Sequence, residues 1–255
     1  MPTIVTCFKW VVDEAYVRRG TSGHLDFTSV DYKISNYDRN AIEEAVRLRE
    51  AHKGSVIALT VGVPKCAKGV KDALSRGPDQ AYFVADPSFG SLDASQTAAI
   101  LAEVVRSRIK SYHLILCGEG SSDLYARQVG PRLAQRLEIP CVSSVQKLSI
   151  EGDRLVVERR ADAELETIEV IMPALVTVLP EINTPRIPGV KDTLMASKKP
   201  VVIIKKEELS QVPEGRLQTI DFTASIMERR CERFGTEPAE ITRFVDALHR
   251  KGLIK

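Results

Sequence analysis

The stretch Gly118–Pro131, GEGSSDLYARQVGP, holds the residues of this 255-residue chain that are best suited to binding a phosphate. It combines closely spaced glycines with the paired hydroxyls of Ser121 and Ser122, and it lies between a strand-like run and a helical pattern. Glycine lets the backbone approach a ligand closely, and exposed amides at a helix N-terminus bind anions. Arg127 adds a cation suited to a charge-assisted bond with a phosphate oxygen. The composition favours a nucleotide-binding loop, with a plain turn between strand and helix as the alternative.

The loop differs from the commonest nucleotide motifs. No Gly-Lys-Ser/Thr follows its glycines and no G-x-G-x-x-G follows the first strand, which disfavours a P-loop NTPase and an ordinary NAD dehydrogenase. An adenylating or pyrophosphatase-type enzyme would need a Ser-Gly-Gly-x-Asp-Ser loop after the first strand. This chain has Cys7-Phe8-Lys9-Trp10 there instead.

The sequence shows neither the residue spacing of a catalytic nucleophile with its base nor a cluster of metal ligands. No Ser, His, Asp or Cys set has the spacing of a nucleophile with its base. Glu119 and Asp123 are better suited to capping the loop and binding hydroxyls than to acid–base work. Five cysteines without a C-x-x-C pair and four scattered histidines offer no cluster of metal ligands. We therefore expect no catalytic side chain and no metal site.

Charge and hydropathy narrow the class of protein further. Lys and Arg number 36 against 34 Asp and Glu, and a net charge of +2 argues against a nucleic-acid binder. No apolar run approaches the roughly 20 residues of a membrane span. The N-terminus, MPTIVTCFKW, lacks the pattern of a signal peptide, and the odd cysteine count argues against a disulfide framework. We expect a cytoplasmic protein.

Strands must alternate with helices to position the loop. Strand-like runs cover Ile4–Lys9, Ser55–Val61, Ala81–Ala85 and His113–Cys117, and helical spacing covers the segment after Ser35, Val70–Leu74, Ala94–Lys110 and Val129–Leu137. We expect Ser35 and Asp38 to form a capping box, with Glu43 and Glu44 pointing outward. This order predicts a parallel sheet whose ligand site lies at the carboxyl ends of the strands. Cys7–Lys9, Val61–Pro64 and the residues from Gly118 onward should converge there.

The second half of the chain has a different pattern. Leu155–Arg160 and Glu166–Met172 predict an antiparallel hairpin, and Ala174–Val178 a buried strand. Three prolines interrupt regular structure before a strand at Val201–Ile204. The tail carries one apolar helical stripe, Ile241, Phe244, Val245 and Leu248, which requires a surface to cover it, on its own domain or on a partner. We expect an α/β domain over 1–182, a loop with a returning strand over 183–204, and a C-terminal arm over 205–255.

Three blocks in order give the chain a family resemblance. They are the first strand with Ile34–Ala45 (ISNYDRNAIEEA), the loop Gly118–Pro131, and Val157–Glu166 (VERRADAELE) leading to Met172–Thr177. Together they resemble the β subunit of electron-transfer flavoproteins from residue 1 to about 205. The loop sequence Ser-Ser-Asp-Leu-Tyr-Ala is most similar to the loops of the Fix and carnitine-associated branch. Ala163 departs from the signature, which usually has Gly, Asp or Glu there.

The resemblance implies an electron carrier without catalytic side chains of its own. The expected fold is a Rossmann-like parallel sheet flanked by helices, similar to adenine-nucleotide α-hydrolases, with an added antiparallel hairpin and an extended C-terminal arm. Family members pair with a larger α subunit that holds most of the redox-active FAD. The β subunit's own site takes AMP or, in bifurcating branches, a second FAD. Partners would be the α subunit and an acyl-CoA-type or other flavin dehydrogenase.

Matching positions give the implied site residues. The cofactor contacts would be Cys7, Phe8, Lys9, Ser35, Asn36, Tyr37, Asp38, Val61, Gly118, Glu119, Gly120, Ser121, Ser122, Asp123, Leu124, Tyr125, Ala126, Arg127, Gln128 and Val129. By the same matching, Tyr37 would lie near the partner's flavin ring. Asn183–Lys191 resembles the family's recognition loop, in which Val190 takes the position of an apolar anchor, with Lys191, Lys198 and Lys199 nearby. The residues implied to recognise a partner are Arg186, Val190 and Lys191. Without the resemblance, this segment has the composition of a solvated loop before an edge strand.

Two questions stay open at this level. Bifurcating members usually carry Asp-Gly-Asp-Thr and a small residue where this chain has Asp123–Ala126 and then Arg127, and a bulky cation there would either bind phosphate or crowd a diphosphate. The alternative to an electron carrier is a stand-alone adenine-nucleotide sensor of the same fold, which would bind ATP or AMP without flavin.

Overall fold

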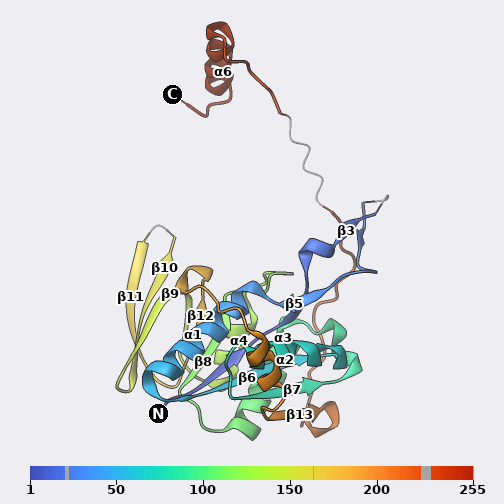
Figure 1. The fold of residues 1–255 in the computed structure, drawn as a ribbon, viewed down its shortest axis with the longest axis vertical. Coiled ribbons are helices and arrows are strands. Elements are labelled where there is room, and N and C mark those ends of the chain that lie inside the picture. Colours follow the sequence, from blue (N-terminus) through green and yellow to red (C-terminus); the bar gives the residue numbers. More distant parts are fainter. Residues whose placement is uncertain (21–22, 163, 225–230, 255) are drawn as a thin grey trace.

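A computed structural model describes residues 1–20, 23–162, 164–224 and 231–254. Within these residues nine strands form one sheet, in the order β11-β10-β9-β12-β8-β1-β6-β7-β13 (Figure 1). Their bounds are β1 Thr3–Cys7, β6 Ser55–Gly62, β7 Gln80–Ala85, β8 Leu114–Gly118, β9 Cys141–Glu151, β10 Arg154–Ala161, β11 Glu164–Ile171, β12 Ala174–Val178 and β13 Val201–Lys205. The strands from β9 to β13 in this order run parallel, and β10 and β11 add an antiparallel hairpin at one edge.

Helices cover both faces of the sheet. Their bounds are α1 Asn36–His52, α2 Ala67–Ser75, α3 Ala94–Val104 with a π-helical turn Val105–Ile109, α4 Val129–Leu137, α5 Val190–Ala196 and α6 Pro238–Arg250. Successive side chains of a strand point to opposite faces, so Ile4 packs with α1 and α2 whereas Val5 packs with α3 and α4. Both faces are apolar, as expected for a parallel sheet between two helical layers. The predicted α/β class with a parallel, Rossmann-like sheet is confirmed.

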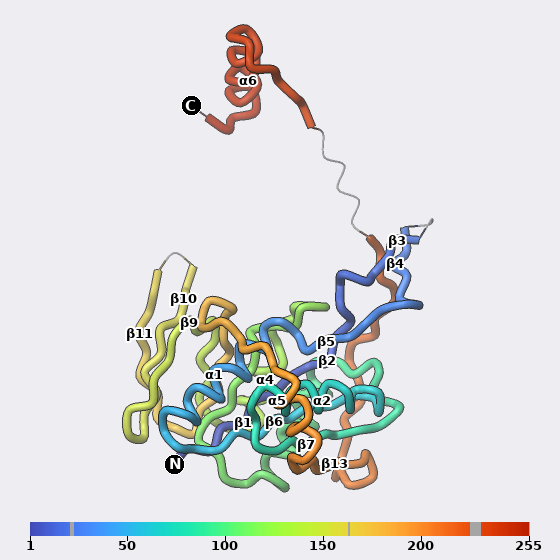
Figure 2. Tube along the Cα trace, in the orientation of Figure 1, coloured from blue at the N-terminus to red at the C-terminus, as the bar shows by residue number. Residues whose placement is uncertain are grey.

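A small excursion follows β1. Two short ladders, β2 (Trp10–Val12) with β5 (Tyr32–Ile34) and β3 (Arg18–Arg19) with β4 (Leu25–Asp26), carry the chain away from the sheet and back to α1. Figure 2 shows this excursion projecting beside the C-terminal segment. Residue Leu25 donates its N–H to the Phe222 carbonyl at 3.4 Å, and the rings of Phe27 and Phe222 lie 5.7 Å apart.

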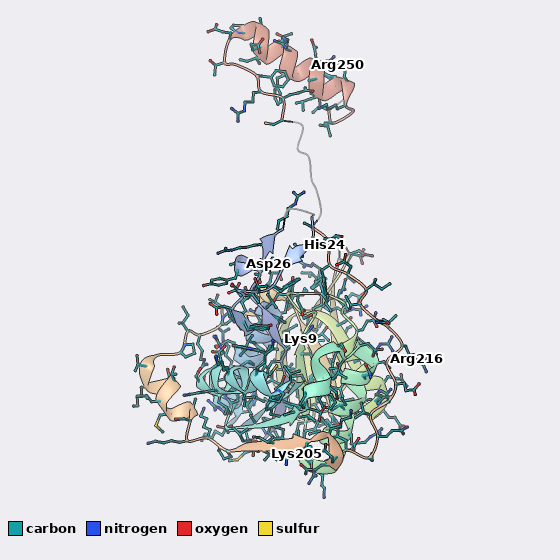
Figure 3. All side chains as sticks on the ribbon, turned by 90° about the vertical axis from the view of Figure 1, so that its right-hand side faces the viewer. Lys9, His24, Asp26, Lys205, Arg216 and Arg250 are labelled. Carbon is teal, nitrogen blue, oxygen red and sulfur yellow. The ribbon has the colours of Figure 1, made fainter. Side chains whose placement is uncertain are left out.

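The C-terminal segment falls into two parts. Its first part, up to Ala224, packs on the body, where Arg216 N–H donates to Asp93 at 2.7 Å and Ser210 N–H to Glu103 at 2.5 Å. Figure 3 labels Arg216 along the body and Arg250 on α6, which is drawn apart from it. The first part of the expected arm over residues 205–255 therefore contacts the body of the chain.

Three local expectations were wrong. Ser35 precedes α1 but its hydroxyl does not cap the helix, so no capping box forms with Asp38. Glu43 and Glu44 are buried rather than outward, because basic and amide side chains from residues 183–186 contact them. The segment after Gly189 forms the short helix α5 rather than an irregular loop. Apart from these three, strand β9 is an element that was not predicted. Ala163, the departure from the family signature, lies outside the described residues.

Candidate functional site

The centre of the sheet has a topological switch point. Strand β1 lies between β6 and β8, and the chain moves outward from β1 through β6 and β7 before α3 returns it to β8 on the other side. Helices α1 and α2 lie on one face and α3 and α4 on the other. Ligands of open α/β sheets bind in the crevice at the carboxyl ends of strands that flank such a point. The ends of β1 and β8 are therefore the expected position of a site.

Asp38 joins these two strand ends. Its carboxylate accepts the backbone N–H of Lys9 at 2.8 Å and that of Gly118 at 3.1 Å. Asp38 is buried, and desolvation raises its carboxyl pKa to about 7 although the two N–H bonds act in the opposite direction. The first turn of α1, the end of β1 and the end of β8 are thus held together by one side chain.

Ser35 connects the helix to the loop itself. Its hydroxyl accepts the backbone N–H of Ser122 at 3.1 Å, which explains why it does not cap α1. The hydroxyl of Ser122 is buried and has no hydrogen-bond partner among the described residues. Buried polar groups in folded proteins are nearly always paired, so an unpaired hydroxyl inside a ligand loop is suited to a ligand atom. It supports the predicted role of this loop.

Glu119 is the centre of a second group of contacts. Its buried carboxylate accepts the Tyr125 hydroxyl at 2.5 Å and the Ser144 hydroxyl at 2.8 Å, and it forms an ion pair with Arg127 at 2.9 Å. Tyr125, Arg127 and Ser144 all have left-handed backbone, with φ of 46°, 59° and 60°. Such conformations are uncommon for residues other than glycine and persist where the surroundings enforce them. The contacts of Glu119 supply that enforcement.

Aromatic rings and charges lie at the outer side of the loop. The rings of Tyr37 and Tyr125 are 5.1 Å apart, and the guanidinium of Arg127 lies 5.8 Å from the Tyr125 ring centre. A Cβ on Gly120 would lie 2.5 Å from the Tyr125 ring, so this glycine permits the packing of Tyr125. Lys9 pairs with Asp123 at 2.6 Å. Both Lys9 and Arg127 are therefore paired with carboxylates, and a phosphate that binds either cation would have to replace its carboxylate partner.

The structure brings most of the predicted cofactor residues together. Cys7 and Phe8 are buried at the end of β1, and Val61 lies near the end of the neighbouring β6. Asn36, Leu124, Ala126 and Gln128 are exposed around the loop, beside Ser121 and Ser122. Helix α4 begins only at Val129, so the serines do not lie at its N-terminus as expected.

The residues predicted to recognise a partner lie elsewhere. Arg186 contacts the middle of α1 through Glu43 and its last turn through Glu50, and Val190 and Lys191 begin α5. Val190 is 80% exposed, so it is free to meet another protein. This segment and the loop after Gly118 are thus separate surfaces joined by α1.

Ser144 is the residue that sequence reasoning missed. It lies on β9, whose residues Cys141–Glu151 show no unbroken alternation, and its role depends on an acid 25 residues away in the chain. No local pattern marks it. Its φ of 60° is a conformation in which Asn or Gly is more usual, so a serine at this position does not indicate the left-handed backbone.

Replacing Glu119 with Gln should lower the phenol pKa of Tyr125. The hydrogen bond to Glu119 is the main reason why that pKa is raised to about 12, since a neighbouring carboxylate favours the protonated phenol. We expect the pKa of Tyr125 in Glu119→Gln to return toward its ordinary value near 10. Ultraviolet titration of the tyrosines measures it, with Tyr125→Phe identifying the transition. An unchanged titration would show that Glu119 and Tyr125 do not interact.

The part of the chain that the structure describes contains no helix long and apolar enough to cross a bilayer. In the same residues, no three His, Cys, Asp or Glu side chains gather as metal ligands would.

A comparison with protein families shows to which family the chain belongs. The family model described as the electron transfer flavoprotein domain matches residues 23–209. The match includes α1, the loop from Gly118 to Gln128 and the segment with α5, which are the elements that build both surfaces described above. It covers well over half of the chain, and the chain therefore belongs to the electron transfer flavoprotein family.

Proposed function

We propose that this chain is the β subunit of a heterodimeric electron transfer flavoprotein, which shuttles electrons between dehydrogenases through an FAD shared with the α subunit. Proteins of the family are electron carriers rather than enzymes. The unpaired buried hydroxyl of Ser122 at the switch point is the observation that carries the proposal, because it is suited to a nucleotide phosphate or ribose in the loop.

The nucleotide of this subunit is AMP or a second FAD. Both contain the same adenylate group, and the same residues would hold it: the amides of the loop from Gly118, the hydroxyls of Ser121 and Ser122, and Arg127 after it leaves Glu119. A bound FAD would supply electron transfer, whereas AMP would make the site structural. Asp38 positions the loop in either case, because it fixes Gly118 to the end of β1.

A second surface is proposed to dock an acyl-CoA-type or other flavin dehydrogenase. Ile187, Val190, Leu194 and Met195 are 92%, 80%, 64% and 47% exposed, which is unusual for large apolar side chains so close in sequence. Exposed apolar groups of this kind are typical of interaction sites. Lys191 lies beside the anchor position Val190 and suits an acidic rim on the partner.

The arm is proposed to reach the α subunit through α6. Ile241, Phe244 and Val245 are exposed on this helix, and Leu248 is partly buried. The segment before Ala224 already packs on the body, so α6 is the part of the arm left for a partner.

Cofactor analysis of the heterodimer tests the proposal. The chain is co-expressed with its α subunit, the purified complex is denatured, and the released FAD and AMP are quantified by chromatography. One FAD with one AMP would indicate one-flavin carriage, and two FAD without AMP would place a redox cofactor in this subunit. Neither nucleotide, and no stable complex, would overturn the proposal and favour the stand-alone sensor.

The same co-purification tests the arm. Deleting residues 231–255 should reduce the yield of heterodimer at least tenfold while the melting temperature of the isolated body stays unchanged. The matched variants are Phe244→Ser, which lies on the apolar stripe, and Arg243→Ser on the same turn as a control. Equal yields of heterodimer from the wild type, the deletion, Phe244→Ser and Arg243→Ser would show that α6 does not contact the α subunit.

A further inference from the structure

Arg186, expected at the partner surface, is instead bound by its own subunit. Its backbone N–H and its Nε both donate to one oxygen of Glu43, at 3.1 Å and 2.8 Å, and a terminal nitrogen reaches the other oxygen at 3.2 Å. A second terminal nitrogen donates to Glu50 at 3.0 Å. The Arg186 carbonyl accepts a hydrogen bond at 3.2 Å from Arg76, the residue that follows α2. The side chain thus has few donors left for a partner.

The acid that holds Arg186 is out of reach of any partner. The side chain of Glu43 is only 6% exposed, whereas that of Arg186 is 36% exposed. Hydrogen bonds to charged groups in such positions are stronger than neutral ones. Glu43 also accepts the Nε of Arg47 from the same helix at 3.0 Å, so α1 itself holds the buried carboxylate in place for Arg186. Arg186 therefore fixes the chain to α1 by a buried contact that a docking protein does not touch.

Other contacts hold the segment on both sides of Arg186. Asn183 exchanges hydrogen bonds with Asn40, at 2.8 Å and 3.0 Å, and donates to Glu44 at 2.9 Å. Beyond α5, the Lys199 ammonium donates to the Leu74, Gly77 and Pro78 carbonyls at the end of α2, at 2.8 Å, 3.2 Å and 2.7 Å. The exposed apolar side chains lie between these two anchors.

We propose that Arg186 is a positioning residue, which holds the segment 183–199 in its docking conformation before a dehydrogenase arrives. The proposal rests on the proposed function of this segment. A free segment of this length would lose conformational entropy on docking, and a segment already fixed to α1 and α2 avoids most of that loss. Affinity for the dehydrogenase then depends on Glu43, although Glu43 never meets it.

The same helix also carries the nucleotide site. Asp38 lies in the first turn of α1, Asn40 and Glu43 follow within the next turns, and all are buried. The two surfaces are thus built on one rigid element.

Three variants in the purified heterodimer test the proposal: Arg186→Gln, Glu43→Gln and the double variant. Hydrogen exchange of residues 186–197 and the affinity for a purified acyl-CoA-type dehydrogenase are measured for each. We expect each single variant to exchange about tenfold faster in this segment and to bind about five- to tenfold more weakly. The double variant should be no worse than the single ones, because residues of one contact are not additive.

Val190→Ala is the comparison for direct contact. It should weaken binding without changing hydrogen exchange, since its side chain is exposed. Glu50→Gln provides a surface variant in case Glu43→Gln unfolds, and it should show the same changes to a smaller extent. Normal binding and exchange in Glu43→Gln, with weaker and less salt-dependent binding in Arg186→Gln, would overturn the proposal and place Arg186 in the interface.

The outcomes separate this inference from the function on which it rests. If the dehydrogenase binds neither the wild type nor any variant, while exchange in Arg186→Gln and Glu43→Gln is faster as expected, the docking function fails and the anchoring of the segment stands. If Val190→Ala weakens binding but exchange is unchanged in both charge variants, the docking function stands and the positioning role fails.

Discussion

Gly118→Ala is expected to destabilise the protein by about 3 kcal/mol and to remove its nucleotide, since added core volume that cannot be accommodated has costs of this order. A Cβ at this position would lie 2.7 Å from the Asp38 carboxylate and 2.7 Å from both the backbone carbon and the Cβ of Tyr37. The Tyr37 atoms belong to or adjoin the backbone, and the Asp38 carboxylate is buried and hydrogen-bonded to Lys9 and Gly118, so none of them moves away easily. The end of β8 and the first turn of α1 would have to separate.

Denaturant unfolding and cofactor content measure this effect. Gly90→Ala is the matched control, because its nearest neighbour, Val63 Cγ1, is 3.6 Å away, an ordinary contact. We expect the control to change the free energy of unfolding by less than about 0.5 kcal/mol, as surface substitutions usually do. Wild-type stability and nucleotide content in Gly118→Ala would show that α1 does not press on the end of β8.

The close approach at Gly118 illustrates what local pattern can predict. Buried parallel strands are continuous apolar runs, so β1, β6, β7, β8 and β12 could be located from composition alone, and their order with the helices predicted the switch point. The glycines and serines after β8 predicted a ligand loop. These inferences depend on residues that are adjacent in sequence.

The partners of several polar side chains could not be predicted, because they depend on contacts between segments that are distant in sequence. Ser35 and Asp38 have the spacing of a capping box, yet each binds a backbone N–H of a different segment, at Ser122, Lys9 and Gly118. Glu43 and Glu44 follow a helical pattern that would expose them, but Asn183 and Arg186 bury them from about 140 residues away. Local spacing indicates which hydrogen bonds a side chain can make. It does not indicate which of the possible partners the folded chain brings into contact.

The same limit applies to the inner part of the site. Glu119 was interpreted as a residue that caps the loop and binds hydroxyls. The hydroxyls that it accepts in the structure belong to Tyr125 and to Ser144 of β9, which local spacing could not identify. For Arg127 the sequence left two roles open, binding a phosphate or crowding a diphosphate. Its ion pair with Glu119 adds a condition, because a phosphate must compete with a buried carboxylate for the guanidinium.

Asp38→Asn is expected to remove a large pH dependence of stability. Burial raises the carboxyl pKa to about 7 from an ordinary value of 3.8, so the folded protein binds this proton more tightly than the unfolded chain does. The stabilising contribution is therefore complete below pH 4 and is lost as the pH rises through about 7. Linkage gives a loss of about 4 kcal/mol over this window for one group with such a shift.

Urea unfolding of both proteins between pH 4.5 and pH 8.5 measures this contribution. Groups that titrate alike in the two proteins cancel in the difference, so wild type minus Asp38→Asn isolates the carboxyl. We expect that difference to fall as the pH rises and to level off above pH 8. Asparagine keeps one oxygen to accept an N–H from Lys9 or Gly118 but cannot ionise, so the variant should still fold. A difference that stays flat would mean that the Asp38 carboxyl is not buried between the two strand ends, and the site would then lack the side chain that joins β1 to β8.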